Sequence, residues 1–362
     1  MSDLALLDSD LSEEIIQTIV ESTFAQHGRI ERRSGGLCGL VYFFDQGENI
    51  HPRWIAVKIP RTPKSNRDER NRRFMREMEI QHRTYYHEFV CHPFDYDVVH
   101  DTPAILYRCA NCDLAKWLQE DGHSDIARLA TLAYLTTALA HCRSRGVLCH
   151  QDLKPQNVLM RNYRLDFRDL PDEDVFTIPL LADFGLANLW IDRQQSEGAK
   201  PYMAPEQWLT KKADGASDIF SLGVMIFEVM SRGIHPMGER TSDWWPEPNA
   251  GNSKKWLRDE VWEKWAKKGC PPSNMAAISD DVAKIVRSCM SSSPSDRPSL
   301  NEIQESLLHS LKALDERAYE QACFRISSAN SQAQTTESWP YLNQRLERLR
   351  VLMRRDGICD DG

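Results

Sequence analysis

The chain has 362 residues, of which 41% are hydrophobic and 27% are charged, and its formal net charge is −8. This composition is typical of a globular protein, and the chain is long enough for two lobes with sizeable cores. Its net negative charge does not favour binding to nucleic acid. No apolar run approaches the roughly 20 residues that span a bilayer, and the acidic start lacks the basic segment of a secretory signal. Ten cysteines lie without framework spacing. We therefore expect free thiols, a reducing cytoplasmic location and no membrane partner.

The beginning of the chain changes from a helical to a strand pattern. Residues 11–27 are predicted to form a helix that Ser12 caps. Its apolar face consists of four residues at helical spacing, namely Ile15, Ile16, Ile19 and Val20. The β-rich runs 40–44 and 54–59 then flank a turn around Gly47. This change predicts a helical extension ahead of a β-rich unit.

The rest of the chain is predicted to be mostly helical. A heavily charged segment, 66–89, has helical spacing, and a short strand is expected at 104–107. Three further helices are predicted at 126–141, 218–231 and 301–319. The segment 218–231 is apolar nearly all round, which predicts a central position.

The C-terminal end combines a polar stretch with a basic helix. Residues 326–338 are rich in Ser, Gln and Thr and are predicted to be a linker. A last helix over 340–355 has five arginines, and its apolar face is formed by Leu342, Leu346, Leu349, Leu352 and Met353. We expect this helix to dock on the protein's own surface, with dimerisation or binding to an acidic surface as alternatives.

The segment from His150 to Asn157 carries the strongest chemical signal. It places the carboxylate of Asp152 two residues before the amine of Lys154, and the amide of Asn157 follows three residues later. A base, a phosphate-binding cation and a metal-binding oxygen are what transfer of a phosphoryl group to a hydroxyl requires. The segment therefore indicates phosphoryl transfer.

Two more motifs, Asp183-Phe184-Gly185 and Ala204-Pro205-Glu206, follow in order. Together with the first segment they resemble the eukaryotic-type protein kinases over about residues 30–312, and Lys154 is typical of the serine/threonine branch. The resemblance implies that Asp152 accepts or orients the hydroxyl proton and that Lys154 neutralises charge on the γ-phosphate. It implies that Asn157 and Asp183 hold Mg²⁺, with Mn²⁺ as the alternative ion.

The strand motif Ile55-Ala56-Val57-Lys58 resembles the one that carries the family's phosphate-binding lysine. The expected partner of Lys58 is a helix glutamate. Glu77 fits the family's pattern and is favoured, and Glu79 is the alternative. Two residues of helix rotate by roughly 200°, so only one of the two can face Lys58. Gln81, one turn after Glu77, stands where the family usually packs an apolar residue.

The resemblance also implies a nucleotide site for ATP. The loop 34–41 aligns with the family's glycine-rich motif if Ser34 replaces the first glycine. Glycines let backbone N–H groups approach phosphate. The hinge for adenine is expected at 106–109, Asp113 is expected to reach the ribose, and Leu159 to form the adenine floor. The implied ATP-binding residues are Gly36, Gly39, Val41, Ala56, Lys58, Leu106, Cys109, Asp113 and Leu159.

Three features imply a protein substrate rather than a small molecule. The motif ending at Glu206 is present, Arg297 is expected as its buried ion-pair partner, and Asp218 opens the central helix. Antibiotic and choline kinases share the loop of the catalytic segment but generally lack these features.

Two residues depart from the family's pattern. Gln151 replaces an arginine that normally binds a phosphate on the activation loop, and Gln cannot form that charge-assisted fork. Ala199 replaces a threonine that normally contacts the catalytic Asp and Lys. Since 186–200 contains one hydroxyl, on Ser196, we expect no need for activation-loop phosphorylation.

Two segments are candidates for interactions. Residues 161–175 resemble an insertion, which is either an interaction loop or a tolerated surface loop. Residues 241–268 lie where the family often docks substrates or regulators, and at least half of the tryptophans there are expected in the core. These tryptophans are Trp244, Trp245, Trp256, Trp262 and Trp265.

These patterns together predict an α+β fold of the two-lobed protein kinase type, with a small β-rich N-lobe and a larger helical C-lobe. We expect a helical extension at 1–27, the N-lobe at 28–107, the C-lobe at 108–315 and a C-terminal extension at 316–362. The expected function is transfer of the ATP γ-phosphate to serine or threonine of a protein substrate. The alternatives are a nucleotide-binding pseudokinase scaffold and a small-molecule phosphotransferase.

Overall fold

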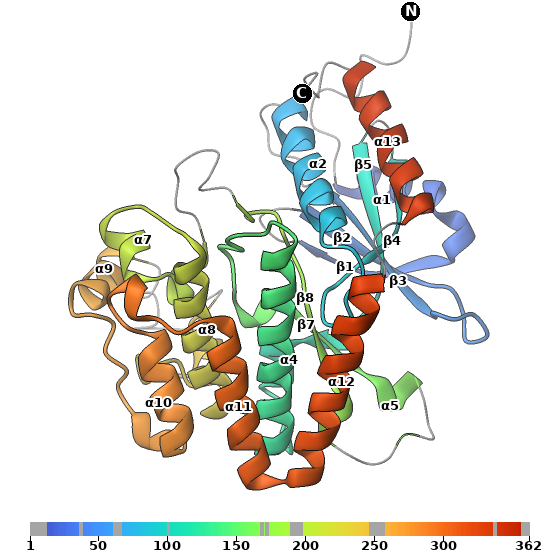
Figure 1. Ribbon diagram of the computed structural model, residues 1–362. Helices are drawn as coiled ribbons and strands as arrows, with labels where there is room; N and C mark the ends of the chain where they lie inside the picture. Colours follow the sequence, from blue (N-terminus) through green and yellow to red (C-terminus); the bar gives the residue numbers. More distant parts are fainter. Residues whose placement is uncertain are drawn as a thin grey trace, which may run out of the picture. The chain divides into compact units, whose positions relative to one another are not determined.

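The computed structural model describes residues 13–35, 39–60, 67–99, 102–166, 170, 174–188, 198–245, 258–335 and 339–355, which form two compact units. The first unit contains Met1–Tyr85, His92–Cys109 and Thr336–Gly362, and the second contains Tyr86–Cys91 and Ala110–Thr335. This division differs from the predicted segments, because residues 86–91 fall in the second unit and the described residues 339–355 fall in the first. Figure 1 draws the elements of both units.

The first unit is built on one antiparallel sheet with the strand order β1-β2-β3-β5-β4. Its strands are β1 (Arg29–Gly35), β2 (Gly39–Asp45), β3 (Trp54–Pro60), β4 (Pro93–Val99) and β5 (Thr102–Arg108). The strand runs expected from the sequence lie within β2, β3 and β5. Alternate residues of β2 from Leu40 onward are buried, because successive side chains point to opposite faces of a sheet, whereas three consecutive residues of β3, Ile55, Ala56 and Val57, are buried.

An N-terminal helix covers one face of this sheet. Helix α1 (Glu13–Thr23) and a short 3-10 turn, η2 (Ala25–His27), occupy the predicted helical segment. Val20 and Phe24 are fully buried in a cluster with β2, β3 and β5, and Ile16 and Ile19 pack against it. Ile15, which was predicted on this face, is 46% exposed instead. The predicted cap Ser12 lies outside the described residues.

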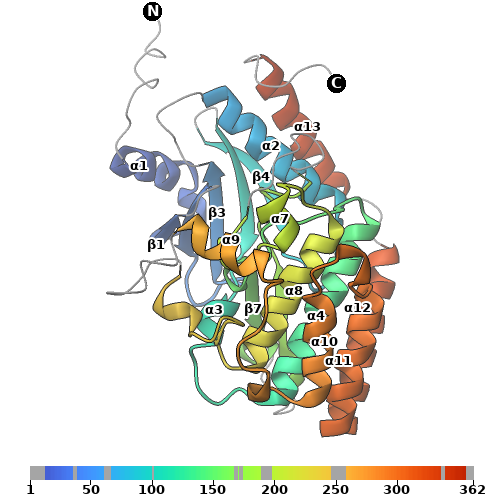
Figure 2. The same ribbon diagram turned by 90° about the vertical axis from the view of Figure 1, so that its left-hand side faces the viewer.

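Two helices share a second core in the first unit. Helix α2 (Arg67–Arg83) follows β3, and the C-terminal helix α13 (Pro340–Arg355) lies over β4 beside α2 (Figure 2). Their common cluster combines residues of α2, β4, β5 and α13, namely Phe74, Met75, Met78, Tyr96, Ile105, Leu342, Leu346, Leu349 and Met353. The helix predicted at 340–355 is confirmed.

The second unit is mainly helical around a three-stranded sheet. The strands β6 (Cys112–Asp113), β7 (Val158–Asn162) and β8 (Thr177–Leu181) pair in that order. Helices α4 and α8 contain the helical segments predicted at 126–141 and 218–231, and both helices are buried along most of their length. The helices are α3 (Leu114–Trp117), α4 (Asp125–Ser144), α5 (Tyr163–Asp166), α7 (Pro205–Leu209), α8 (Gly215–Met230), α9 (Asp259–Lys267), α10 (Asp280–Cys289), α11 (Leu300–Leu314) and α12 (Glu316–Thr335).

The predicted linker at 326–338 is wrong over its described part, because residues up to 335 belong to helix α12. Helices α4, α11 and α12 lie side by side in Figure 1. The buried stripe of α12 is built from small side chains apart from one isoleucine: Ala318, Ala322, Ile326, Ala329 and Ala333. A stripe of alanines lets helices approach closely but carries little hydrophobic signal, so the polar residues between them dominate the sequence pattern.

The segment predicted as an insertion contacts helix α12 at its described ends. Arg325 of α12 forms an ion pair of 2.6 Å with Glu88. Its guanidinium also lies 5.4 Å from the ring of Tyr163, near the start of the segment, and 5.3 Å from the ring of Phe176, directly after its end. The described part of the segment is therefore an intramolecular contact.

These observations confirm the α+β class, with a β-rich first unit and a helical second unit. None of the helices in the described part of the chain is long and apolar enough to cross a membrane.

Candidate active site

In the first unit the sheet and helix α2 bring Lys58 and Glu77 together. Lys58 Nζ lies 2.5 Å from Glu77 Oε1, and the two side chains are only 12% and 2% exposed. Lys58 Nζ also lies 6.0 Å from the ring centroid of Phe74, one turn before Glu77. The structure thus pairs Lys58 with Glu77 and not with Glu79. Removing either partner would leave a buried charge unpaired, which is costly.

The polar residue Gln81 has a specific partner. Tyr107 Oη on β5 donates a hydrogen bond of 2.7 Å to Gln81 Oε1. Tyr107 therefore gives the side-chain amide of Gln81 a hydrogen-bond partner at a position where the family usually packs an apolar residue. Sequence patterns missed Tyr107, because its role depends on the pairing of β3 with β5.

The expected phosphate loop is described only in part, since Gly36 lies outside the described residues. Gly39 begins β2, and a Cβ atom there would meet the carbonyl oxygen of Ile59 at 2.7 Å. Only glycine fits this close approach. Val41 of β2 pairs with Lys58 of β3, so the two residues lie directly opposite each other in the sheet.

The side chain of Leu106 lies in the core of the first unit. In the pairing of β3 with β5, Leu106 lies opposite Val57, and both belong to the core that α1 covers. Ala56, which was expected to contact ATP, lies opposite Tyr107. Because side chains alternate along a strand, Tyr107 rather than Leu106 shares the face of Ala56 and Lys58.

Cys109 ends the hinge segment. Its backbone N–H donates a hydrogen bond of 3.1 Å to the carbonyl of Trp54. Burial raises the pKa of the Cys109 thiol to about 12 and that of Cys112 to about 11, so neither thiol is poised as a thiolate. No group of three or more His, Cys, Asp and Glu side chains suited to a metal occurs among the residues described.

In the second unit the segment 150–157 holds Asp152 between donors. Asp152 Oδ2 accepts hydrogen bonds from Lys154 Nζ at 2.6 Å and from Asn157 Nδ2 at 2.8 Å. The carbonyl of Asp152 accepts a second bond from Asn157 Nδ2, also at 2.8 Å. The three side chains therefore form one network, as a base that must keep its orientation requires.

The other oxygen of Asp152 is bound by the backbone of Ala199. The N–H of Ala199 donates to Asp152 Oδ1 at 3.0 Å. The preceding Gly198 has φ +151°, and a Cβ atom there would lie 2.5 Å from the carbonyl of Gln151. Glycine at this position permits the close approach. The family's threonine hydroxyl is missing at Ala199, but the backbone N–H of Ala199 contacts Asp152 instead.

Asp218 of helix α8 binds the backbone of the same segment. It is buried, and its two carboxylate oxygens accept the N–H groups of His150 at 2.7 Å and Gln151 at 3.0 Å. Gln151 adopts a left-handed φ of +66°, which is strained for a residue with a side chain. Burial raises the pKa of Asp218, and these hydrogen bonds oppose that effect.

Asp183 follows strand β8 and also has a left-handed φ, at +63°. Its neighbour Phe184 is buried, and its ring lies 5.2 Å from the ring of His150. Backbone pairing joins the two motifs, because the N–H of Ala182 donates to the carbonyl of Asn157 at 2.9 Å. The amide nitrogen of Asn157 is committed to Asp152. Its amide oxygen and the carboxylate of Asp183 are hard oxygen donors of the kind that Mg²⁺ prefers.

Strands β6 and β7 place the other two residues predicted to bind ATP. Asp113 pairs with Leu159 across these strands. Asp113 Oδ1 accepts the backbone N–H of Lys116 at 2.8 Å and thereby caps helix α3. The carboxylate of Asp113 therefore has a structural role besides any contact with a ligand.

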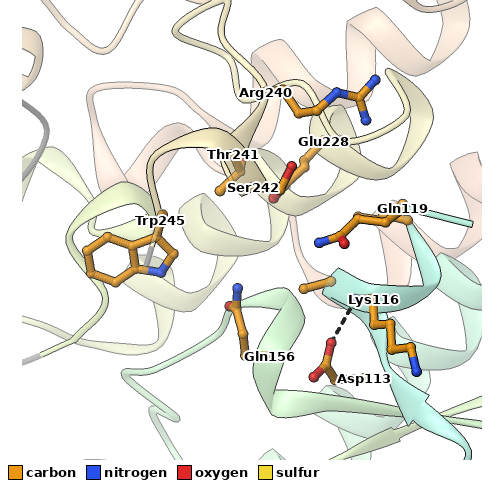
Figure 3. A pocket seen from close by; sticks show the side chains of 12 residues that line it. Asp113, Lys116, Gln119, Gln156, Glu228, Arg240, Thr241, Ser242 and Trp245 are labelled. Carbon is orange, nitrogen blue, oxygen red and sulfur yellow. Dashed lines mark hydrogen bonds between the residues drawn. The ribbon is translucent and has the colours of Figure 1, made fainter. Parts of the chain in front are cut away.

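A pocket of about 410 Å³ lies next to the segment 150–157 in the second unit (Figure 3). Gln156 lines it, together with residues of α3, α8 and the turn η6 (Thr241–Asp243). Figure 3 shows Glu228, Arg240 and Trp245 around the same space. The pocket contains both acidic and basic groups, and it is large enough for one side chain of a partner.

Glu228 lines this pocket and was not identified from the sequence. It is buried, and Tyr202 Oη donates to its carboxylate at 2.7 Å. Burial raises the pKa of Glu228 to about 7. A carboxylate in the apolar second half of helix α8 was the signal that could have identified it.

The ion pair expected between Glu206 and Arg297 forms. The Arg297 guanidinium donates to both oxygens of Glu206, at 2.7 and 2.8 Å, and the arginine side chain is 1% exposed. Arg297 also donates to the carbonyls of Ser291 and Ala216, at 3.0 and 2.8 Å. Such a bidentate pair with further bonds fixes the geometry of the helix α7 that carries Glu206.

Most of the tryptophans described in the region 241–268 belong to the core. Trp244, Trp262 and Trp265 are buried and surround the buried ring of His235 at centroid distances of 5.6–5.8 Å. Trp245 lines the pocket of Figure 3, and Trp256 lies outside the described residues. Among the tryptophans described in this region, Trp245 is the one that is not buried in the core.

Comparisons with known proteins show the family of this chain. A family model described as a protein kinase domain matches residues 38–309. Calcium-dependent protein kinase 7 of Oryza sativa subsp. japonica is 28% identical over 236 residues, which cover 63% of this chain and 38% of that protein. Serine/threonine-protein kinase PkaA of Streptomyces coelicolor is 25% identical over 201 residues, which cover 54% of this chain and 32% of that protein.

A third relative matches a shorter stretch. Serine/threonine-protein kinase AtPK2/AtPK19 of Arabidopsis thaliana is 34% identical over 110 residues, covering 30% of this chain and 20% of that protein. The chain thus spans less than half the length of each of these three relatives.

Proposed function

The chain belongs to the protein kinase domain family, and from this premise we propose that it transfers the γ-phosphoryl group of ATP to serine or threonine hydroxyls of a protein. The observation that carries the proposal is the network around Asp152, whose carboxylate is bound by Lys154, Asn157 and the backbone of Ala199. A carboxylate held by donors on both oxygens keeps one orientation toward an incoming hydroxyl.

The proposed roles follow from the contacts within each unit. In the second unit Asp152 orients the hydroxyl and accepts its proton, and Lys154 stabilises charge on the transferred group. In the first unit Lys58, held by Glu77, binds the phosphates of ATP. Positioning and charge neutralisation supply most of the catalysis in such reactions.

Asn157 and Asp183 would hold the divalent metal. Their oxygens suit Mg²⁺, and Mn²⁺ prefers similar ligands. When bound, such an ion neutralises negative charge on the phosphates of ATP.

A protein substrate is supported by the second unit. The buried pair of Glu206 and Arg297 stabilises the segment after Ala199, and the pocket of Figure 3 offers a place for a substrate side chain. A reducing compartment such as the cytoplasm is the proposed location, because the described cysteines are thiols rather than disulfides.

The proposal is tested by transfer of label from γ-labelled ATP to the protein itself and to a generic protein substrate. We expect label with the wild type and none with Asp183→Ala, because the variant lacks a metal ligand. Binding of ATP without transfer by the wild type would favour a pseudokinase scaffold. Transfer to small hydroxylated molecules alone would favour a small-molecule phosphotransferase.

We also propose that activity does not depend on phosphorylation of the activation segment. Gln151 cannot bind a phosphate as an arginine does, and the one hydroxyl of 186–200, on Ser196, lies outside the described residues. Ser196→Ala is expected to retain the wild-type rate in the labelled-ATP assay after phosphatase treatment of both proteins. Loss of activity in this variant alone would overturn the proposal.

A further inference from the structure

Helix α2 presents two neighbouring stripes of side chains to two different partners. Phe74, Glu77 and Gln81 recur at helical spacing, and they contact Lys58 or Tyr107 of the sheet. Glu79 and His82 lie on the adjacent stripe, and both bond to helix α13. Positions 75 and 78 complete this second stripe, and both methionines are buried in the cluster shared with α13.

The contacts between α2 and α13 are both polar and apolar. Arg350 Nε lies 2.9 Å from Glu79 Oε1, and His82 Nε2 donates to Asn343 Oδ1 at 2.5 Å. Tyr96 Oη on β4 lies 3.3 Å from His82 Nδ1, which fixes the ring between the sheet and α13. The polar bonds flank an apolar seam, so they set the rotation of α2 about its axis.

Helix α13 is in turn anchored to the sheet. Arg345 forms two hydrogen bonds with Asp95, at 2.8 and 3.3 Å, and an ion pair of 3.2 Å with Asp97. Tyr341 Oη donates to Asp95 at 3.1 Å. Both aspartates belong to β4, so α13 connects the sheet to the flank of α2 that faces away from Lys58.

Helix α2 depends on these contacts because its own sequence contains few apolar residues. Over Arg67–Arg83 it is mostly charged, and only Phe74, Met75, Met78 and Ile80 are apolar. Short helices obtain most of their stability from packing of an apolar face. The buried residues of α13 in the shared cluster, Leu342, Leu346, Leu349 and Met353, complete a face that α2 cannot form alone.

We propose that α13 is a built-in positioning element of the active site, which holds α2 in the rotation that presents Glu77 to Lys58. Leu346, Leu349 and Arg350 are then positioning residues, since they act through α2 and touch neither substrate nor nucleotide. The inference rests on the proposed function, because it assigns a catalytic purpose to the pair of Lys58 and Glu77.

The test introduces a charge into the seam of the full-length protein. Leu349→Asp is expected to release α13 and α2 and to lower kcat/KM for ATP on the order of 10²-fold, the effect of misplacing a group by about 1 Å. The dissociation constant of a fluorescent ATP analogue should rise in parallel. Hydrogen exchange should quicken in 67–83 and stay unchanged in α4 of the second unit.

Two variants serve as matched controls. Val351→Asp makes the same kind of change on α13 at a residue that is 42% exposed, and it should leave kcat/KM, nucleotide binding and exchange unchanged. Leu349→Met keeps the apolar volume and should behave as the wild type. If Leu349→Asp quickens exchange in α2 but keeps the nucleotide affinity and kcat/KM of Val351→Asp, α13 is only structural and the inference fails.

A charge swap keeps the test decisive if Leu349→Asp does not fold. Arg350→Glu and Glu79→Arg should each weaken nucleotide binding, and the double variant should recover it, because the ion pair is re-formed with reversed charges. Failure of the double variant to recover would overturn the role of this pair. If the wild type binds nucleotide but transfers no phosphate, the proposed function fails, and the binding data still decide the role of α13.

Discussion

Asp152→Asn is expected to lower the rate of phosphoryl transfer by about 10²–10⁴-fold, the usual contribution of a positioned general base. The substitution replaces one carboxylate oxygen by an NH₂ group. Each oxygen of Asp152 accepts a donor, from Lys154 and Asn157 on one side and from Ala199 on the other. An NH₂ group on either side therefore meets a donor, so the variant loses the base and part of its orientation.

The measurement compares kcat and the dissociation constant of nucleotide in both proteins. We expect the loss to lie in kcat, with nucleotide affinity nearly unchanged, since Asp152 is assigned to the hydroxyl of the substrate. Asp281→Asn is the matched control, because Asp281 is exposed on α10 and pairs only with Lys284 among the contacts described. A variant Asp152→Asn with the wild-type kcat would remove Asp152 from the mechanism.

Arg297→Ala is expected to lower the free energy of unfolding by about 3–5 kcal/mol, as for other broken buried ion pairs. The substitution leaves Glu206 without the two hydrogen bonds of 2.7 and 2.8 Å that it accepts from the guanidinium. It also removes the donors to the carbonyls of Ser291 and Ala216. Chemical denaturation of the wild type and the variant measures the difference.

A double-mutant cycle separates this pair from a general loss of packing. Glu206→Ala and Arg297→Ala combined should cost clearly less than the sum of the two single changes, because residues in direct contact are not additive. Lys284→Ala removes an exposed ion pair and should change stability little. An Arg297→Ala protein that unfolds like the wild type would show that the pair does not stabilise the second unit.

Residues that are close in the sequence could be placed together from the sequence alone. The segment 150–157 needs only a short loop to bring Asp152, Lys154 and Asn157 together, and the structure places them within hydrogen-bonding distance. Helix geometry turns residues two apart to nearly opposite faces, so only one of Glu77 and Glu79 could face Lys58, and the family's pattern favoured Glu77. The structure uses both faces, with Glu77 on Lys58 and Glu79 on Arg350.

Features that depend on strand pairing were not predictable in the same way. Leu106 and Tyr107 are neighbours in an apolar run, and only the pairing of β5 with β3 decides which of them shares the face of Ala56. A shift of one residue exchanges the two faces of a strand. The sequence contains no local signal for this pairing, so it could not show that the side chain of Leu106 lies in the core while that of Tyr107 shares the face of Ala56.

Helix α12 was missed for a different reason. Four of the five residues in its buried stripe are alanines, which give a weak hydrophobic pattern between Ser, Gln and Asn residues. Its position is held by contacts that are distant in sequence, such as the ion pair of Arg325 with Glu88 and the hydrogen bond of His87 Nε2 with Asn330 Oδ1 at 3.2 Å. Composition alone therefore suggested a linker.

The most direct test of the central claim is phosphoamino-acid analysis of a generic protein substrate after incubation with the wild-type protein and γ-labelled ATP. The account predicts labelled phosphoserine or phosphothreonine with the wild type and none with Asp152→Asn under the same conditions. Label that appears only as free phosphate, or equally with both proteins, would contradict transfer to a protein hydroxyl through Asp152.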